Sequence, residues 1–273
     1  LTTEGALTTF EALELGAFDY VAKPSGTVSS DIHIAGREII QKIKLAYKSA
    51  NRKNIRDRIK RLSNPAAARK TASGIKTGIP ESAGLSKIVV IGVSTGGPST
   101  LMEVLPMLPA ELKAALIVVQ HMPPSFTTSF AKRLDQACRF PFKEAETGDV
   151  LQDGRGYLAP GGYQLLVRSE GGMLRLSNNP KTLFMPSVNI TMESVLEAYG
   201  GKNVIGVLMT GMGDDGADAM VKIRRAGGIT IAEDESTAVV FGMPREAIER
   251  GGAEIVAPSY RIADEIVKAV NRK

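Results

Sequence analysis

Three polar residues of this sequence, a serine, a histidine and an aspartate, each stand just after a segment that predicts a buried strand. The segments are 87–93, 115–120 and 203–209, and the polar residues that follow them are Ser94, His121 and Asp215. A neutral imidazole can take the proton of a serine hydroxyl, and a carboxylate on the other ring nitrogen fixes the tautomer and stabilises the imidazolium. These residue types therefore predict hydrolysis by a serine nucleophile.

The surroundings of Ser94 favour this prediction. Gly92-Val93-Ser94-Thr95-Gly96 fits the G-x-S-x-G nucleophile elbow, between a strand and a helix that Pro98 opens. Glycine-rich turns let backbone N–H groups approach a developing oxyanion, and the candidate donors lie in 94–97 and in Gly211-Met212-Gly213. The rest of the α/β-hydrolase pattern is missing, because there is no HGGG-type motif and the order is Ser, His, Asp. A serine hydrolase with a different sheet topology is therefore predicted.

Other interpretations of the same residues stay open. The turn at Ser94 could hold a phosphate or a nucleotide, although its glycines do not match the dinucleotide-binding fingerprint and the Walker lysine is missing. Ser94 could also be a helix N-cap, His121 could bind a backbone carbonyl, and Asp215 could simply favour a helix start. Against this, the carboxyl ends of parallel strands meet at one sheet edge, where ligands bind.

The pattern of apolar segments from residue 87 onward predicts an α/β fold. Strands and helices alternate, which is typical of a mainly parallel, doubly wound, Rossmann-like sheet with helices on both faces. Helices are expected after Pro98 and Pro124, and strands and helices continue to the end of the chain. Short strands and turns are expected within 150–167. The remaining predicted elements are helix 188–199, a helix ending near Ala226, strand 228–232, helix 245–249, strand 254–256 and helix 263–271.

Residues 1–85 have a different pattern. Apolar spacing predicts a helix over Thr3–Leu15, a short strand over Phe18–Ala22 and a helix from Ser30 to about Ser49. These elements make no closed core, so residues 1–50 are expected to be the end of a truncated domain. The chain begins with leucine, which also suggests a fragment of a longer protein. Residues 51–85 are small, polar and basic, with Pro and Gly, and predict a linker.

Basic residues concentrate in this N-terminal part. Between Arg37 and Lys70 twelve lysines and arginines stand against two acids, so this window carries +10 of a chain whose net charge is +5. A solvated helix and linker is the favoured interpretation. A nucleic-acid arm or an acidic protein partner are the alternatives, and the window lacks interleaved aromatic residues apart from Tyr47.

Composition limits the classes of protein further. With 273 residues, of which 43% are hydrophobic, the chain can bury one sizeable core. No apolar run approaches the ~18 residues of a membrane span, and no signal-peptide pattern opens the chain. The single cysteine, Cys138, excludes an internal disulfide and is expected to be a small buried hydrophobe. With only His33 and His121, a histidine-based metal centre is not expected.

Two resemblances to known families follow from longer motifs. LGAFDYVAKPSG, at residues 15–26, resembles the last strand and lysine-proline turn of a response-regulator receiver domain, where Lys23 matches the lysine that contacts the phosphoryl group. From about Lys87 to the C-terminus, the sequence resembles the catalytic domain of chemotaxis protein-glutamate methylesterases. The motifs are IGVSTGGP, VVQHMPPSFTTSFAKRL, GYLAPGG, MPSVN, LMTGMGDDGADAM and DESTAVVFGMPREAI.

The second resemblance implies specific roles. It assigns Ser94 as nucleophile, His121 as base and Asp215 as acid, and it places Thr95, Met212 and Gly213 at the oxyanion and substrate-binding positions. Two residues depart from the expected pattern. Asn189 stands where an aspartate is expected, and Asp214 adds a carboxylate beside Asp215, which leaves open which carboxylate reaches His121.

The resemblance also implies partners and a domain plan. The expected function is hydrolysis of γ-glutamyl methyl esters of methyl-accepting chemotaxis receptors, with deamidation of receptor glutamines, in the cytoplasm. A chemotaxis histidine kinase is expected to act through the receiver domain of the full-length protein. No cofactor, metal, nucleic acid or membrane insertion is implied. The expected domains are a receiver remnant at 1–50, a linker at 51–85 and a catalytic domain at 86–273. Because 1–50 retains Lys23 but no phospho-accepting aspartate, the chain is expected to be constitutively active, with the 30–49 helix free to lie on the catalytic domain through Ile32, Ile39 and Ile43.

Overall fold

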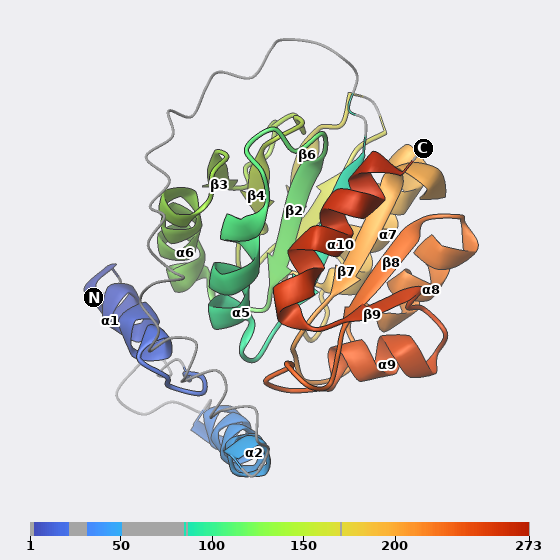
Figure 1. The fold of residues 1–273 in the computed structure, drawn as a ribbon. Coiled ribbons are helices and arrows are strands. Elements are labelled where there is room, and N and C mark those ends of the chain that lie inside the picture. The colour runs from blue at the N-terminus through green and yellow to red at the C-terminus, as the bar shows by residue number, and fades with distance from the viewer. Residues whose placement is uncertain (1–2, 22–31, 51–84, 86, 170, 273) are drawn as a thin grey trace.

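A seven-stranded parallel sheet forms the centre of the molecule (Figure 1). The computed structural model describes residues 3–21, 32–50, 85, 87–169 and 171–272. The strands of the sheet are β1 (Ile88–Val93), β2 (Ala115–Gln120), β3 (Phe142–Glu144), β4 (Gly156–Leu158), β7 (Val204–Leu208), β8 (Ile229–Glu233) and β9 (Ile255–Ala257). A separate antiparallel pair consists of β5 (Gln164–Val167) and β6 (Leu174–Ser177).

Helices alternate with these strands along the chain. The α-helices of the described residues are α1 (Thr3–Glu14), α2 (Ile32–Ala50), α5 (Gly97–Val104), α6 (Pro124–Ala137), α7 (Val188–Tyr199), α8 (Ala217–Arg225), α9 (Met243–Glu249) and α10 (Ser259–Asn271). The described residues also form the short 3₁₀ helices η1 (Leu105–Met107) and η2 (Gly201–Asn203). The predicted mainly parallel α/β fold is therefore confirmed.

The strand order, β3-β4-β2-β1-β7-β8-β9, places β1 between β2 and β7. Val93, the last residue of β1, is paired with Gln120, the last residue of β2, and Gly92 is paired with Leu208 at the end of β7. The chain leaves β1 toward β2 and later returns to β1 on its other side, so the strand order reverses there. Such a switch point opens a crevice at the carboxyl ends of the strands.

The alternating side chains of β1 divide the core into two layers. Val89, Ile91 and Val93 belong to one buried cluster, which α5, α6 and α10 complete. Ile88 and Val90 belong to the other, which α7, α8, α9 and the β5-β6 pair complete. A strand that is apolar on both faces needs helices on both, and this accounts for the doubly wound arrangement.

The N-terminal segment meets the first of these layers through α1. Phe10 and Leu13 are buried, and the ring of Phe10 lies 5.1 Å from that of Phe130, which belongs to α6. α2 behaves differently, because Ile39 and Ile43 are 42% and 63% exposed. The expectation that Ile39 and Ile43 hold this helix to the catalytic domain is therefore wrong, while the side chain of Ile32 lies outside what the structure describes.

Other local predictions need correction. No strand forms over 18–21, the described part of the predicted strand Phe18–Ala22. The strands β3 and β6 were not predicted, because segments of three or four residues carry too little periodicity. α9 and α10 begin at Met243 and Ser259, earlier than expected. The predicted linker falls almost entirely outside the described residues.

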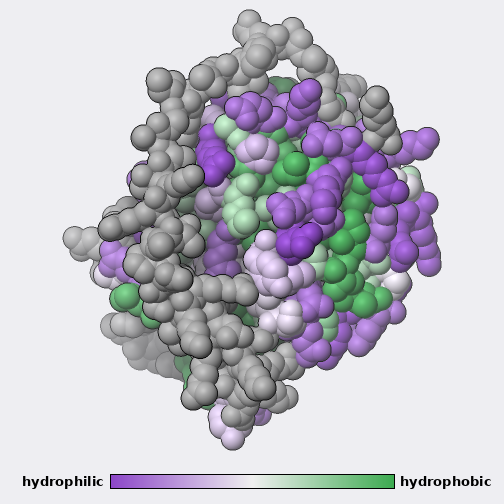
Figure 2. Space-filling model, viewed as in Figure 1, coloured by the Kyte–Doolittle hydropathy of each residue, from purple (hydrophilic) through white to green (hydrophobic). Residues whose placement is uncertain are grey.

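The outer surface of α10 is polar, as Figure 2 shows for the face seen in Figure 1. Its inner side carries Ile262, Ile266 and Val270, which are buried against the sheet. Within the part of the chain that is described, no helix is both long and apolar enough to cross a membrane.

Candidate active site

Ser94 is the first residue after β1, and hydrogen bonds hold both its backbone N–H and its carbonyl. Its N–H donates to Thr210 O at 3.0 Å, and its carbonyl accepts from Gly97 N at 2.8 Å and from Gln120 Nε2 at 3.0 Å. The N-cap of α5 is Gly96, not Ser94, and no side chain caps this helix. Among the described residues nothing bonds to Ser94 Oγ, so the hydroxyl of a rigidly placed serine is free.

The glycines on each side of Ser94 have separate structural reasons. A Cβ on Gly92 would lie 2.4 Å from Val188 Cγ1, so this glycine lets the start of α7 approach β1 closely. Gly96 has φ +77°, a left-handed conformation that side chains disfavour. Of the two glycines, only Gly96 reflects the tight strand-to-helix turn, and Gly92 reflects the packing of α7 on β1.

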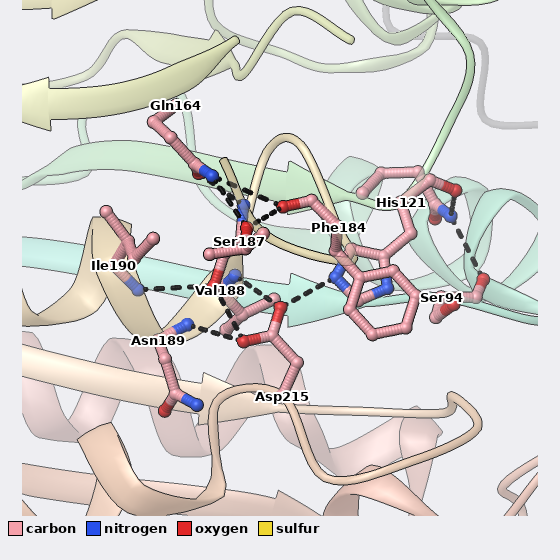
Figure 3. Close-up of polar contacts among 11 residues, drawn as sticks. Ser94, His121, Gln164, Phe184, Ser187, Val188, Asn189, Ile190 and Asp215 are labelled. Carbon is pink, nitrogen blue, oxygen red and sulfur yellow. Dashed lines mark hydrogen bonds and ion pairs between the residues drawn. The ribbon is translucent and has the colours of Figure 1, made fainter. Parts of the chain in front are cut away.

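His121 follows β2 and contacts two other segments. Its Nε2 lies 2.8 Å from Asp215 Oδ2, and both side chains are more than nine-tenths buried. The ring of Phe184 stacks on the imidazole, with centroids 4.0 Å apart and planes within 4°. The other nitrogen, Nδ1, is buried and has no hydrogen-bond partner among the described residues. In Figure 3, Ser94 lies on the side of the imidazole away from Asp215.

Asp215 follows β7 and accepts four hydrogen bonds. Its Oδ2 accepts from His121 and from Val188 N at 2.7 Å, and its Oδ1 accepts from Ser187 Oγ at 2.8 Å and Asn189 N at 3.0 Å. Burial alone would raise the pKa of the Asp215 carboxyl. The hydrogen bond and the charge of His121, with the N–H groups of Asn189 and Val188, outweigh burial and hold this pKa below its usual value. The carboxylate is thus ionised and fixed.

The neighbouring carboxylate, Asp214, points elsewhere. Its Oδ2 lies 2.7 Å from Arg250 Nη2, and its side chain is 62% exposed. Arg250 also contacts Asp218 at 2.8 Å and Glu246 at 3.1 Å. Of the two adjacent aspartates, the one hydrogen-bonded to His121 is Asp215.

Two backbone segments supply possible donors beside Ser94. Thr95 is buried, and its carbonyl accepts from Thr210 Oγ1 at 2.9 Å. Glu233, at the end of β8, fixes Thr210 by accepting from its N–H at 2.8 Å. Within the described residues, the N–H groups of Thr95 and Met212 have no acceptor, and Gly213 is exposed with φ +87°.

The structure brings the candidate residues to one edge of the sheet but joins only some of them. His121 and Asp215 are in hydrogen-bond contact, Ser94 stands at the end of the neighbouring strand, and Ser94 Oγ is not bonded to His121. Lys23 lies outside the described residues. Within the same described ranges, no cluster of three or more His, Cys, Asp or Glu side chains could hold a metal ion.

Residues that sequence reasoning missed complete the site. Phe184 and Ser187 belong to the segment between β6 and α7, and the amide of Gln164 holds that segment. The MPSVN motif contains Ser187 and was a signal for it, but nothing marked Phe184 or Gln164. Asn189, the unexpected residue of that motif, accepts from Ala219 N at 2.9 Å through Oδ1, which caps the start of α8.

The parallel sheet, with a serine, a histidine and an aspartate at the carboxyl ends of its strands, is typical of an α/β domain of the hydrolase type. The family model described as CheB methylesterase matches residues 89–266, and the chain belongs to this family. It is 53% identical to a protein-glutamate methylesterase/protein-glutamine glutaminase of Caldanaerobacter subterraneus subsp. tengcongensis, over 99% of this chain and 75% of that protein.

Proteins that are less similar to this chain are named as methylesterases too. A protein with the same name from Pyrococcus abyssi is 43% identical over 99% of this chain and 72% of its own length. The crystal structure of the CheB methylesterase catalytic domain of Thermotoga maritima is 42% identical and superposes with a TM-score of 0.65. That match covers 67% of this chain and 98% of the solved domain.

Proposed function

We propose that this chain is a protein-glutamate methylesterase that also deamidates glutamine side chains. The observation that carries the proposal is the pairing of His121 with a buried, ionised Asp215 at the strand end beside Ser94. The family and the names of its relatives support the same reaction. The substrates are γ-glutamyl methyl esters and glutamines of chemotaxis receptors.

In the first half of the reaction, Ser94 Oγ attacks the γ-carbonyl carbon of the methyl ester. His121 takes the hydroxyl proton on Nδ1, the nitrogen that Asp215 leaves unoccupied. Since Asp215 accepts from Nε2–H, the neutral ring has its lone pair on Nδ1. The resulting imidazolium donates to the carboxylate, which stabilises its charge.

The negative oxygen of the tetrahedral intermediate needs donors that do not have to reorganise. The N–H groups of Thr95 and Met212 serve as these donors, because neither has an acceptor among the described residues. Gly213, beside Met212, leaves space for the substrate chain since it has no side chain.

Collapse of the intermediate expels methanol, which takes its proton from His121. A water molecule then attacks the glutamyl ester of Ser94, and His121 takes one of its protons. His121 returns this proton to Ser94 as the ester bond breaks, and the glutamic acid product loses its remaining proton to solvent to become the carboxylate. With a glutamine substrate, ammonia is the first leaving group and the same glutamyl-enzyme follows, so one site accounts for both activities.

We also propose that residues 1–50 are the end of a receiver domain, 51–85 a linker and 86–273 the catalytic domain. The relatives that align with 99% of this chain are longer than it, which supports a larger protein of this plan. A histidine kinase would act on the complete receiver domain, and the cytoplasmic part of the receptors would be the substrate.

Two alternative functions would give different results when methanol release is measured. A nucleotide-binding module would use the turn at Ser94 to bind phosphate without hydrolysis, and an interaction protein would act through the basic residues of the N-terminal part. The discriminating experiment incubates the chain with a receptor fragment that carries radiolabelled methyl esters. Release of labelled methanol supports the esterase alone, whereas nucleotide binding without methanol release would contradict it.

A further inference from the structure

The side-chain amide of Gln164 is fully buried, and all of its hydrogen bonds are made to one segment of the chain. Its Nε2 donates to Pro180 O at 3.1 Å, Thr182 Oγ1 at 2.8 Å and Phe184 O at 3.3 Å. Its Oε1 accepts from Ser187 N at 2.8 Å. All four partners lie within 180–187, which we name the clamp segment. Figure 3 shows two of them, Phe184 and Ser187, beside Gln164. A buried amide with this number of partners fixes the backbone that surrounds it.

The clamp segment contacts both titratable residues of the site. Within the segment, the ring of Phe184 stacks on the imidazole of His121. At the C-terminal end of the segment, Ser187 Oγ donates to Asp215, as do the N–H groups of the next two residues, Val188 and Asn189. The positions of the imidazole and of the carboxylate therefore both depend on a segment that forms neither a helix nor a strand.

The geometry of the stack has a chemical consequence. Two neutral aromatic rings prefer an offset or edge-to-face arrangement over a face-to-face one. A ring that carries positive charge is instead attracted to an aromatic face. The parallel contact at 4.0 Å thus suits the imidazolium that forms while the serine proton is held on His121, and it also prevents the ring from tilting.

We propose that Gln164 is a positioning residue for hydrolysis, which acts through the clamp segment to hold Phe184 against His121 and the donors of Ser187 against Asp215. This inference rests on the proposed function, since it assigns His121 as the base. Gln164 itself touches none of the reacting atoms.

The direct test is Gln164→Glu, which keeps the shape and the acceptor for Ser187 N but removes both N–H donors. The control is Gln152→Glu, the same change at an exposed position. We expect kcat for the methyl ester to fall about tenfold or more, with KM within about twofold, because transition-state stabilisation is lost while the substrate contacts remain. The control should match the wild type.

A second readout does not depend on activity. The chain has two histidines, His33 and His121, so the imidazole proton signals can be assigned with a His33→Gln variant. A ring stacked at 4.0 Å shifts the His121 signals upfield, and Gln164→Glu should move them back toward ordinary values. Unchanged signals and unchanged kcat in a folded Gln164→Glu protein would overturn the proposal.

If Gln164→Glu does not fold, changes at the half-buried Phe184 replace it. Phe184→Leu should lower kcat about tenfold and remove the upfield shift, which is the scale of a desolvated cation–π contact. Phe184→Tyr, which keeps the aromatic face, should restore both. Wild-type kcat in Phe184→Leu would overturn the proposal. If the wild type releases no methanol, the proposed function fails, and the NMR signals alone then decide whether Gln164 positions His121.

Discussion

His121 and Asp215 are joined through Nε2 and Oδ2 at 2.8 Å, so the nitrogen left for the serine is Nδ1. In the serine-protease triad the two nitrogens have the opposite assignment. The chemistry is equivalent, because either nitrogen of a neutral imidazole can accept a proton when the other donates. What differs is the approach: the carboxylate is reached from the tip of the ring, and the serine from the side nearer the backbone.

The two adjacent aspartates should differ strongly in their effect on turnover. Asp215→Asn is expected to lower kcat by about 10⁴-fold, the loss known for the equivalent change in a protease triad, because the amide favours the wrong imidazole tautomer. Asp214→Asn should change kcat less than about tenfold, since Asp214 contacts Arg250 at the surface. Rates of methanol release measure both, and the reverse ranking would assign the acid to Asp214.

The stability of the fold should depend on pH through Asp215. Its pKa is lower in the folded chain than in the unfolded one, so its carboxylate stabilises the fold above the ordinary aspartate value of about 3.9. That stabilisation is lost as the pH falls below about 4 toward the folded-state pKa. We expect the free energy of unfolding of the wild type to fall more steeply there than that of Asp215→Asn.

Denaturant unfolding between about pH 6 and 2.5 tests this linkage, a range that brackets the ordinary aspartate value. Asp214→Asn keeps the four hydrogen bonds of Asp215 and serves as the control, with a slope close to that of the wild type. Parallel curves for the wild type and Asp215→Asn would contradict the account.

The N-terminal segment should be anchored by Phe10 without restraining the reaction. Phe10→Ala is expected to cost about 3 kcal/mol of unfolding free energy, the lower end for a buried phenylalanine, because its ring packs on Phe130. Leu15→Ala, at a side chain 90% exposed, is the control and should have little effect. Chemical denaturation followed by circular dichroism measures the difference.

The same variants test regulation. The ring contacts of Phe10 are with Phe126 and Phe130 of α6 and not with a residue of the Ser94 site, so Phe10→Ala should leave the esterase rate unchanged. Acetyl phosphate should also leave it unchanged, since on the proposed domain plan residues 1–50 are only the end of a receiver domain, without its phospho-accepting aspartate. A clear rise in rate with Phe10→Ala or with the phosphodonor would show that the segment restrains the enzyme.

Sequence alone predicts the parts of this protein that depend on long apolar segments. β1, β2 and β7 are buried on both faces, so their ends, and with them Ser94, His121 and Asp215, could be placed at one sheet edge. The clamp segment could not be predicted, because its structure comes from the tertiary contacts of Gln164 rather than from periodicity. For the same reason, the apolar run at 18–21 predicted a strand that, without a neighbouring strand, does not form.

The central claim is that Ser94 is the nucleophile, and the rate of methanol release from a methylated receptor fragment tests it most directly. Ser94→Ala should lower this rate by orders of magnitude, because the attacking hydroxyl is lost. The fold should stay intact, because the backbone hydrogen bonds of residue 94 do not depend on its side chain. Ser99→Ala, a nearby serine in α5, should retain the wild-type rate. A Ser94→Ala protein that releases methanol at nearly the wild-type rate would contradict the account.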